Sequence, residues 1–366
     1  MIRKPVRIGW MLILLWGCSQ PAGAAAPRTA TAAQIPIGGS AEPATSRPPD
    51  DAMVPAADFT TPDATDTPAV PTSTATAERT SISLAFAGDI MLGRSLADRI
   101  LRGEGGTIFA SAEPILQSAD FTVGNLECAI GEGGKKAPKA YTFLAPSGSA
   151  GVLRGAGFDL LSLANNHILD YGVSVLEQTE RLLDEAGIRH VGAGMDESLA
   201  RAPVVVDLHG FRLAFLAYVE VPVEYYGFDP SIWAAGPSSP GVSWAEDDKI
   251  AEDIRAADPQ ADFVIVLLHF GDEGVDVPNK RQRQLSRLAV DNGADLIVGS
   301  HSHMLQGSEE YNQRWIFYSL GNFVFDEFSG KANRSAVLRV TLFRNGTLEY
   351  SLLPMTIVEG VPLTGD

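Results

Sequence analysis

The chain has 366 residues, of which 45% are hydrophobic, and it carries a formal charge of −17 at pH 7. This length and hydrophobic content are sufficient for at least one large core, whereas the negative charge repels phosphate backbones and argues against nucleic acid as a partner. Two cysteines, Cys18 and Cys128, are too few for a disulfide framework, and Cys128 is predicted to be a small core residue.

The N-terminal segment has the parts of a bacterial export signal. Three basic residues precede an apolar run over 8–16 that is too short for a permanent transmembrane helix. Gly17-Cys18 then resembles a lipobox, so we expect residues 1–18 to be a lipoprotein-type signal peptide with a lipid anchor at Cys18. Trp16 departs from the usual lipobox and leaves ordinary secretion as the alternative. Either way, the predicted location is extracytoplasmic.

Residues 19–80 are dominated by Ala, Pro, Thr and Ser, and their few apolar residues follow neither a helical nor a strand period. Such a composition cannot bury enough apolar surface to offset the entropy of folding. We therefore predict a disordered linker that holds the folded part off the membrane. The folded domain is predicted over residues 81–358.

Five predicted strands in that domain each lead into polar side chains. Because ligands bind at the carboxyl ends of strands in α/β sheets, we expect these side chains to meet at one site. The strands and the side chains that follow them are 81–87 with Asp89, 121–124 with Asn125 and Glu127, 160–163 with Asn166 and His167, 263–268 with His269, and 296–298 with His301 and His303.

Helical patterns over 174–186 and 279–292 separate some of these strands, which predicts an α/β architecture. Two hairpins are predicted at 204–218 and 335–353, the second with a type I′ turn at Asn345-Gly346. Hairpins within an α/β chain suggest two sheets packed face to face, with helices outside, in a single domain. The Pro-, Gly- and aromatic-rich segment 221–244 is predicted to be a long loop that shapes a binding site.

The polar side chains at the strand ends suit a divalent metal. Carboxylate, amide and imidazole groups together favour Mn²⁺, Zn²⁺ or Fe²⁺, and a carboxylate can bridge two such ions. Taken singly, Asp89 is as easily a helix cap and Glu127 a surface acid. His301 and His303 are more specific, because residues two apart on an extended segment point to the same side and can face one ion. We therefore predict one or two divalent ions.

Six segments, in this order, resemble the CapA family across residues 82–355. The family is linked to poly-γ-glutamate capsule synthesis and is similar to calcineurin-like metallophosphoesterases, so the resemblance implies a four-layer α/β/β/α sandwich. The segments are GDIMLGR at 88–94, NLE at 125–127, ANNH at 164–167 followed by DYG at 170–172, HFGDE at 269–273, GSHSH at 299–303 and YSLGNF at 318–323.

The resemblance also implies which residues bind metal. They are Asp89 and His303 for a first ion, Glu127 as a bridge, and Asn166, His269 and His301 for a second ion. At Met91 this chain lacks a histidine that phosphoesterases use for the first ion. Either that ion binds weakly with extra water or the site works with one ion.

Catalytic roles follow from the same resemblance. His167 would protonate the leaving oxygen or stabilise the transition state, and Asp170 would orient it. Gly274 replaces an aromatic residue of the family, which puts substrate contacts there in doubt.

Substrate contacts are predicted for Arg94, Asn125 and Asn322. Arg94 follows the first ligand loop closely, and a guanidinium fork suits carboxylate or phosphate. Lys135, Lys136 and Lys139 either clamp the same anion or solvate a loop, and we favour the loop for the first two.

Two functions remain open at this point. The first is a surface-anchored, metal-dependent hydrolase that acts on an anionic polymer, with poly-γ-glutamate implied by the resemblance. The second is a non-catalytic component of a capsule export machine that holds the polymer in the same pocket. Both predict the polymer and membrane-embedded capsule synthesis proteins as partners. A purely structural wall protein would leave the polar strand ends unexplained.

Overall fold

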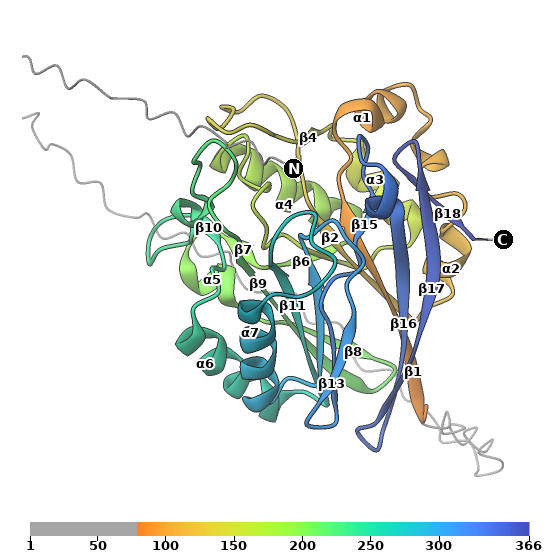
Figure 1. Cartoon of the computed structure of the whole chain (residues 1–366), viewed down its shortest axis with the longest axis vertical. Coiled ribbons are helices and arrows are strands. Elements are labelled where there is room, and N and C mark those ends of the chain that lie inside the picture. Colours follow the sequence, from red (N-terminus) through yellow and green to blue (C-terminus); the bar gives the residue numbers. More distant parts are fainter. Residues whose placement is uncertain (1–78, 366) are drawn as a thin grey trace, which may run out of the picture. The chain divides into compact units, whose positions relative to one another are not determined.

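The computed structural model describes residues 79–365 (Figure 1). The predicted signal peptide, the lipid anchor at Cys18 and nearly all of the predicted linker fall on residues 1–78 and lie outside the described part. None of the helices in the described part has the length and hydropathy needed to cross a membrane.

The first sheet has eight strands and is mixed. Strands β1, β2, β5 and β6 are parallel, β16, β17 and β18 add antiparallel strands beside β1, and β15 pairs with the end of β1 in parallel. In sheet order the strands are β18 (Val361–Thr364), β17 (Leu348–Val358), β16 (Arg334–Phe343), β1 (Ser81–Ile90), β2 (Phe121–Leu126), β5 (Leu160–Ser162) and β6 (Arg189–Val191), with β15 (Asn322–Val324) off this path.

The second sheet has six strands. Its four central strands are parallel, and an antiparallel strand lies at each edge. The order is β13 (Ser308–Tyr311), β14 (Arg314–Phe317), β12 (Leu296–Ser300), β11 (Phe263–Phe270), β9 (Phe211–Glu220) and β8 (Val204–Leu208). Two short pairs complete the strands, β3 (Ala129–Ile130) with β4 (Leu144–Ala145) and β7 (Ala193–Gly194) with β10 (Gly241–Val242).

The two sheets pack against each other. Leu213 and Phe215 of β9 belong to the core shared with the first sheet, where the Phe215 ring stacks on that of Phe121 at a centroid distance of 5.5 Å. The alternate residues Leu216 and Tyr218 belong to a second core under two helices. This alternation is what a strand buried on both faces requires.

Helices cover the outer faces (Figure 1). Helices α6 (Asp247–Ala257) and α7 (Lys280–Asp291) pack on the second sheet. Helices α1 (Arg94–Leu101), α2 (Glu113–Gln117), α3 (Ser149–Ala156) and α4 (Val173–Ala186) contribute to the core of the first sheet, and the short α5 (Glu197–Arg201) lies beside β7. The layers are therefore α/β/β/α, as predicted.

Local sequence explains some of the element ends. Helix α4 ends at Gly187, whose φ of 73° is a left-handed conformation that glycine adopts without strain. Helix α7 begins at Asn279, whose side chain forms a capping box with Gln282. The predicted type I′ turn was wrong, because Gly346 has a positive φ but Asn345 does not; instead the Asn345 side chain accepts hydrogen bonds from Thr347.

Candidate metal centre

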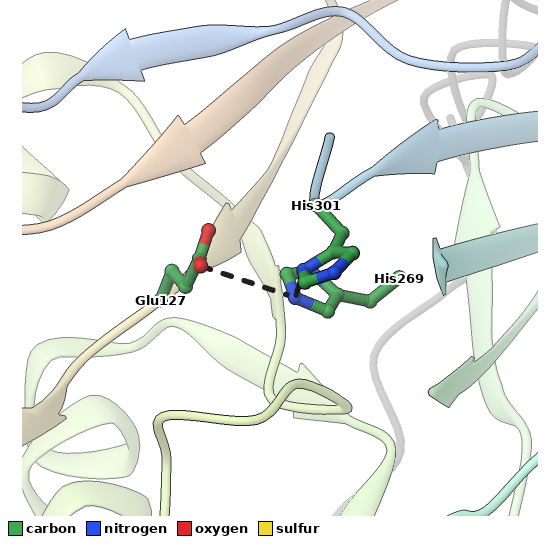
Figure 2. A group of neighbouring side chains, drawn as sticks. All are labelled: Glu127, His269 and His301. Carbon is green, nitrogen blue, oxygen red and sulfur yellow. Dashed lines mark hydrogen bonds and ion pairs between the residues drawn. The ribbon is translucent and has the colours of Figure 1, made fainter. Parts of the chain in front are cut away.

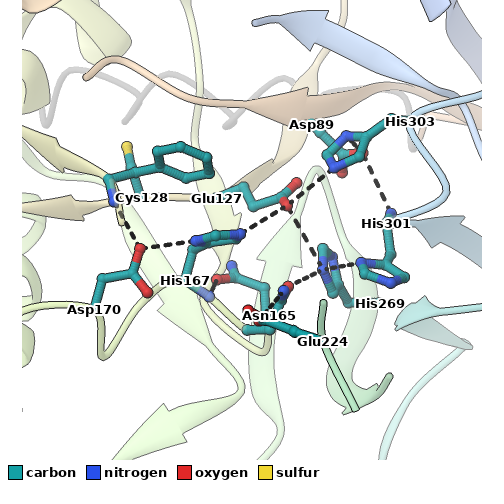
Figure 3. Close-up of polar contacts among 12 residues, drawn as sticks. Asp89, Glu127, Cys128, Asn165, His167, Asp170, Glu224, His269, His301 and His303 are labelled. Carbon is teal, nitrogen blue, oxygen red and sulfur yellow. Dashed lines mark hydrogen bonds and ion pairs between the residues drawn. The ribbon is translucent and has the colours of Figure 1, made fainter. Parts of the chain in front are cut away.

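The side chains predicted to bind metal converge where strands of both sheets end (Figure 3). They form two groups whose ligand atoms lie within 4.8 Å of one another: Asp89, Glu127 and His303 make one, and Glu127, His269 and His301 make the other. Glu127 is common to both. Each of these residues is at most 5% exposed.

Glu127 lies at the centre of the cluster. Neither of its carboxylate oxygens has a hydrogen-bond partner among the described residues, and its Oε1 is 3.7 Å from His303 Nε2 and 3.9 Å from His269 Nε2. Figure 2 shows the carboxylate pointing toward His269 and His301. An unpaired buried carboxylate is costly. The arrangement fits a site in which a cation completes the contacts of Glu127.

The first group is held by hydrogen bonds from neighbouring strands. Asn125 Nδ2 donates to Asp89 Oδ1 at 2.8 Å, and the backbone N–H of His301 donates to Asp89 Oδ2 at 3.3 Å. His303 Nδ1 is 2.7 Å from Asn322 Oδ1, so its N–H is used there and Nε2 is left to face Glu127. This is how metal-binding imidazoles are oriented in proteins.

The second group surrounds His269. Its Nε2 is 2.9 Å from Asn166 Oδ1 and 3.1 Å from His301 Nδ1, while its Nδ1 is 3.0 Å from Ser300 Oγ. His301 Nε2 is a further buried atom without a hydrogen-bond partner in the described structure. Asn166 therefore lies beside this group, as the resemblance implied, and Ser300 joins it as a partner that sequence analysis did not select.

The local prediction for His301 and His303 was wrong. Both have positive φ values, 89° and 56°, in a loop after β12, and not the extended backbone that would point them to one side. Their ring centroids are 6.2 Å apart and they belong to different groups. A left-handed conformation is unfavourable for residues with a side chain, and such strain often occurs at functional sites.

His167 and Asp170 form a buried pair beside the cluster (Figure 3). His167 Nδ1 is 2.7 Å from Asp170 Oδ2, and its Nε2 lies 3.9 Å from Glu127 Oε1. Asn165 supports the loop: its Oδ1 accepts from the His167 N–H at 3.0 Å, and its Nδ2 donates to the Leu126 carbonyl at 2.8 Å. The proposed catalytic histidine is thus fixed against the ligand cluster.

Burial shifts the pKa values of the whole cluster. It raises the pKa of Asp89 to about 7 and, helped by the neighbouring Asp89 charge, raises the pKa of Glu127 well above its usual range. Burial lowers the pKa of His303 to about 4, and it lowers the pKa values of the other three clustered histidines well below their usual range. A neutral imidazole is the form that binds metal. A buried carboxylate is ionised at low cost in free energy only when a cation lies beside it.

Lys139 is a buried cation, which neither of the two predicted alternatives, an anion clamp or a solvated loop residue, anticipated. Its ammonium is fully covered and lies 3.1 Å from Asp170 Oδ1 and 2.7 Å from Glu224 Oε1. It also donates to the Asn166 carbonyl at 2.5 Å, while Glu224 accepts from the Asn166 side chain at 2.9 Å. Lys139 is therefore no clamp for a substrate. Nothing in the sequence distinguishes it from Lys135 and Lys136, both of which are exposed.

A cavity of about 230 Å³ opens beside the cluster. Arg94 lines it, with its guanidinium 4.5 Å from the centre of the Phe143 ring, and Phe143 in turn packs on His167 at a centroid distance of 4.1 Å. The other lining residues are Tyr141, Glu273, His303, Phe325, Glu327 and Phe328. Of the predicted substrate residues, Arg94 is the one placed at this cavity.

Asn125 and Asn322 have partners other than a substrate. Asn322 is fully buried, with its oxygen on His303 and its Nδ2 donating to the Ala332 carbonyl at 3.2 Å. Asn125 is 5% exposed and bonds to Asp89. We therefore assign both residues an orienting role in place of the predicted substrate contact.

Met91 departs from the phosphoesterase pattern and Gly274 from the family pattern, and both departures have structural correlates. Met91 is fully buried, and its sulfur accepts a hydrogen bond from the Gly93 N–H at 3.0 Å. The sulfur is therefore used within its own loop and not as a metal ligand. Gly274 is exposed, and a Cβ atom added there would meet nothing within 4 Å. The missing aromatic therefore leaves that part of the rim open.

Residues 83–327 match the family described as bacterial capsule synthesis protein PGA_cap. The chain belongs to this family. It is 36% identical to the PGA biosynthesis protein CapA of Bacillus subtilis (strain 168) over 285 residues, which are 77% of this chain and 73% of that protein. It is 34% identical to the capsule biosynthesis protein CapA of Bacillus anthracis, over 78% of this chain and 70% of that protein. The predicted CapA resemblance is thereby confirmed.

Two other proteins match this PGA_cap chain less closely. A probable polyglutamine synthesis accessory protein of Mycobacterium tuberculosis is 31% identical over 56% of this chain and 52% of that protein. A solved hypothetical protein from Thermus thermophilus has 16% identity and a TM-score of 0.47, over 75% of this chain and 99% of that chain. That likeness is too remote to indicate function.

Proposed function

We propose that this protein is a metal-dependent hydrolase that acts on an anionic capsule polymer, poly-γ-glutamate, or its precursor during capsule synthesis or export. One observation carries the metal-dependent part: a fully buried Glu127 is shared by two ligand groups and has no other partner in the described structure. The names of the CapA relatives, which refer to PGA and capsule biosynthesis, support the choice of polymer.

The residues of the chain fit that chemistry. One or two divalent ions held by Asp89, Glu127, Asn166, His269, His301 and His303 would polarise a phosphoryl or acyl oxygen and lower the pKa of bound water. Asp170 holds His167 Nδ1, which leaves Nε2 as the atom that exchanges a proton with the reacting group. The orienting residues Asn125, Asn322 and Ser300 keep the ligands in place.

The proposal is tested with the purified full-length protein. We expect elemental analysis after incubation with Mn²⁺, Zn²⁺ or Fe²⁺ to find bound metal. We also expect the loaded protein to cleave either the polymer or a generic phosphodiester, with His167→Ala losing about 10²–10⁴-fold in rate, the range typical of general acid–base catalysis. Protein that retains no metal after any of the three incubations would rule out the proposal.

A second function has its own supporting observation. Met91 leaves the first ion one ligand short of the phosphoesterase pattern, which favours a non-catalytic component of an export machine that only holds the polymer. For that function we expect polymer binding without turnover, and His167→Ala should bind as well as the wild type. Turnover by the loaded wild type would exclude it.

We further propose that the protein works outside the cytoplasmic membrane, anchored through a lipid on Cys18 or secreted, near membrane-embedded capsule synthesis proteins. The support is the basic, apolar and Gly17-Cys18 pattern of the first residues. Labelling cells with a radioactive fatty acid should mark the wild type but not Cys18→Ala. Equal labelling of both would refute the anchor.

A further inference from the structure

Arg94 has two carboxylate neighbours that differ in how firmly they are held. Arg94 Nη1 is 3.3 Å from Asp326 Oδ1 and 3.0 Å from Glu327 Oε2. The Asp326 side chain is 8% exposed, and its Oδ2 accepts from the N–H and hydroxyl of Ser95 at 3.2 and 2.6 Å. The Glu327 side chain is 66% exposed, and Arg94 is its one ion-pair or hydrogen-bond partner among the described residues. One partner is therefore fixed and the other is loosely held.

The Arg94 guanidinium lies near His167, the candidate catalytic residue, with the Phe143 ring in contact with both. It lies over the ring of Phe143 at 4.5 Å and near that of Tyr141 at 5.7 Å, while the ring of Phe143 packs on His167. Stacking of this kind fixes a planar guanidinium while leaving its N–H groups available at the edge. Arg94, Glu327 and His167 all line the same cavity. An anion bound to Arg94 would therefore lie beside the reacting centre.

We propose that Arg94 anchors a carboxylate of the substrate, and that Glu327 is an internal carboxylate which the substrate displaces. An ion pair with so exposed a partner contributes little stability, so replacing Glu327 by a substrate carboxylate costs little free energy. Asp326 cannot leave without giving up two hydrogen bonds at the start of helix α1. This inference rests on the proposed function, since it names the chemical group that the same site recognises.

The proposal specifies the substrate class more closely than net charge does. A protein with a charge of −17 repels a polyanion in general, so binding must depend on a few built-in cations. Arg94 is such a cation at the cavity, and the loosely held one of its two carboxylate partners belongs to a glutamate, Glu327. The exchange therefore favours a chain that carries a carboxylate at this position of the cavity, which His167 also lines, over a neutral chain.

The test is calorimetric titration of the Mn²⁺-loaded full-length protein with a γ-linked glutamate tetrapeptide. Glu327→Gln removes the competing charge and should bind the peptide up to about fivefold more tightly, the factor that corresponds to an exposed ion pair of about 1 kcal/mol. Arg94→Gln should bind weakly, and Glu327→Gln should have no effect in its background. A tetrapeptide with carboxamides in place of the carboxylates should not distinguish Glu327→Gln from the wild type.

Glu104→Gln is the matched control. Glu104 pairs with Arg102 at 2.9 Å just after helix α1, both side chains are about half exposed, and the change in net charge is the same. Its peptide affinity should equal that of the wild type. Arg94→Lys provides a second test should Arg94→Gln fold poorly; it keeps the charge but loses the fork, and should bind more weakly than the wild type.

Three results would overturn the inference. They are a peptide affinity of Glu327→Gln that equals or falls below that of the wild type, a gain as large in Glu104→Gln, and a gain seen with inorganic phosphate but not with the peptide. The metal content of each sample is measured in parallel. Normal metal content with no effect of Glu327→Gln refutes this inference alone, whereas a protein that retains no metal after incubation with Mn²⁺, Zn²⁺ or Fe²⁺ refutes the proposed function.

Discussion

Two buried groups of charges lie side by side in this protein, and the protein neutralises one of them with its own side chains. The ammonium of Lys139 contacts Asp170, Glu224 and the Asn166 carbonyl. Next to this network in space, the carboxylate of Glu127 faces neutral imidazoles and has no hydrogen-bond partner in the described part of the chain. The two groups share Asn166, which contacts Lys139 through its backbone and His269 through its side chain.

The difference separates a structural role from a binding role. A buried charge is tolerated when oppositely charged groups and hydrogen bonds surround it, and the Lys139 network meets that condition. The Glu127 cluster meets it only if a cation joins, so it lowers stability until a ligand binds. Neighbouring sites of similar burial can therefore be told apart by which carboxylates lack a cation beside them. Asp170 Oδ1 has no hydrogen-bond partner in the described structure either, but the Lys139 ammonium lies 3.1 Å from it.

The largest expected effect on stability comes from breaking the Lys139 network. Lys139→Met leaves Asp170 and Glu224 without their buried cation and should lower the free energy of unfolding by about 3–5 kcal/mol. The measurement is urea unfolding at pH 7 in EDTA. Lys331→Met is the control, because Lys331 pairs with Asp276 at 2.6 Å on the surface, and should cost less than about 1 kcal/mol. Equal losses would show that the Lys139 network does not stabilise the fold.

The next largest effect on stability comes from neutralising Glu127, and in the absence of metal it has the opposite sign. In EDTA, Glu127→Gln should be as stable as the wild type or more stable, because a buried charge without a partner is removed. With Mn²⁺ at about a hundred times its Kd, the wild type should gain about 2.7 kcal/mol and the variant far less. Urea unfolding with and without Mn²⁺ measures both. A large loss for the variant in EDTA would mean that Glu127 is already neutralised by the protein.

The smallest effect is a pH dependence of the metal-free protein. Burial raises the pKa of Asp89 from 3.8 to about 7, so between these values the folded state binds more protons than the unfolded state. Stability from this group is therefore complete below pH 3.8 and falls as pH rises toward 7, by up to about 1.4 kcal/mol per pH unit.

Asp89→Asn removes the titration of Asp89 and also the part of the Glu127 pKa shift that comes from the Asp89 charge, whereas the clustered histidines titrate in both proteins. In EDTA, the wild type should lose stability relative to Asp89→Asn as pH rises from 5 to 7. Urea unfolding at pH 5, 6, 7 and 8 provides the measurement. Parallel curves for the two proteins would show that Asp89 is ionised in the folded state throughout.

Much of the fold could be predicted because its signals are local. Alternating and fully apolar runs marked the central strands, helical periodicity marked α4 and α7, and their alternation implied the layered architecture. The polar residues after five strands could be grouped in advance, since parallel strands of one sheet end at the same edge and the paired sheets bring two such edges together. Asp89, Glu127 and His269 are placed by that rule.

Other features depended on contacts between distant segments. Lys139 has the same sequence context as an exposed lysine, and its burial depends on Glu224 arriving from the long loop after β9. Asn322 orients His303 because β15 pairs with β1, which sets Asn322 opposite Asp89. The left-handed backbone at His301 and His303, which sends their imidazoles to different groups, has no counterpart in the residue pattern.

By itself, then, the sequence determined the layers, the family and the edge at which the polar side chains gather, because hydrophobic period and strand direction are properties of short segments. Only the tertiary structure decided how those side chains divide around Glu127 and which charges Lys139 neutralises. The physical reason is that these outcomes depend on distances between residues far apart in the chain. The same type of charged residue can be buried or exposed, and the sequence pattern around it does not show which.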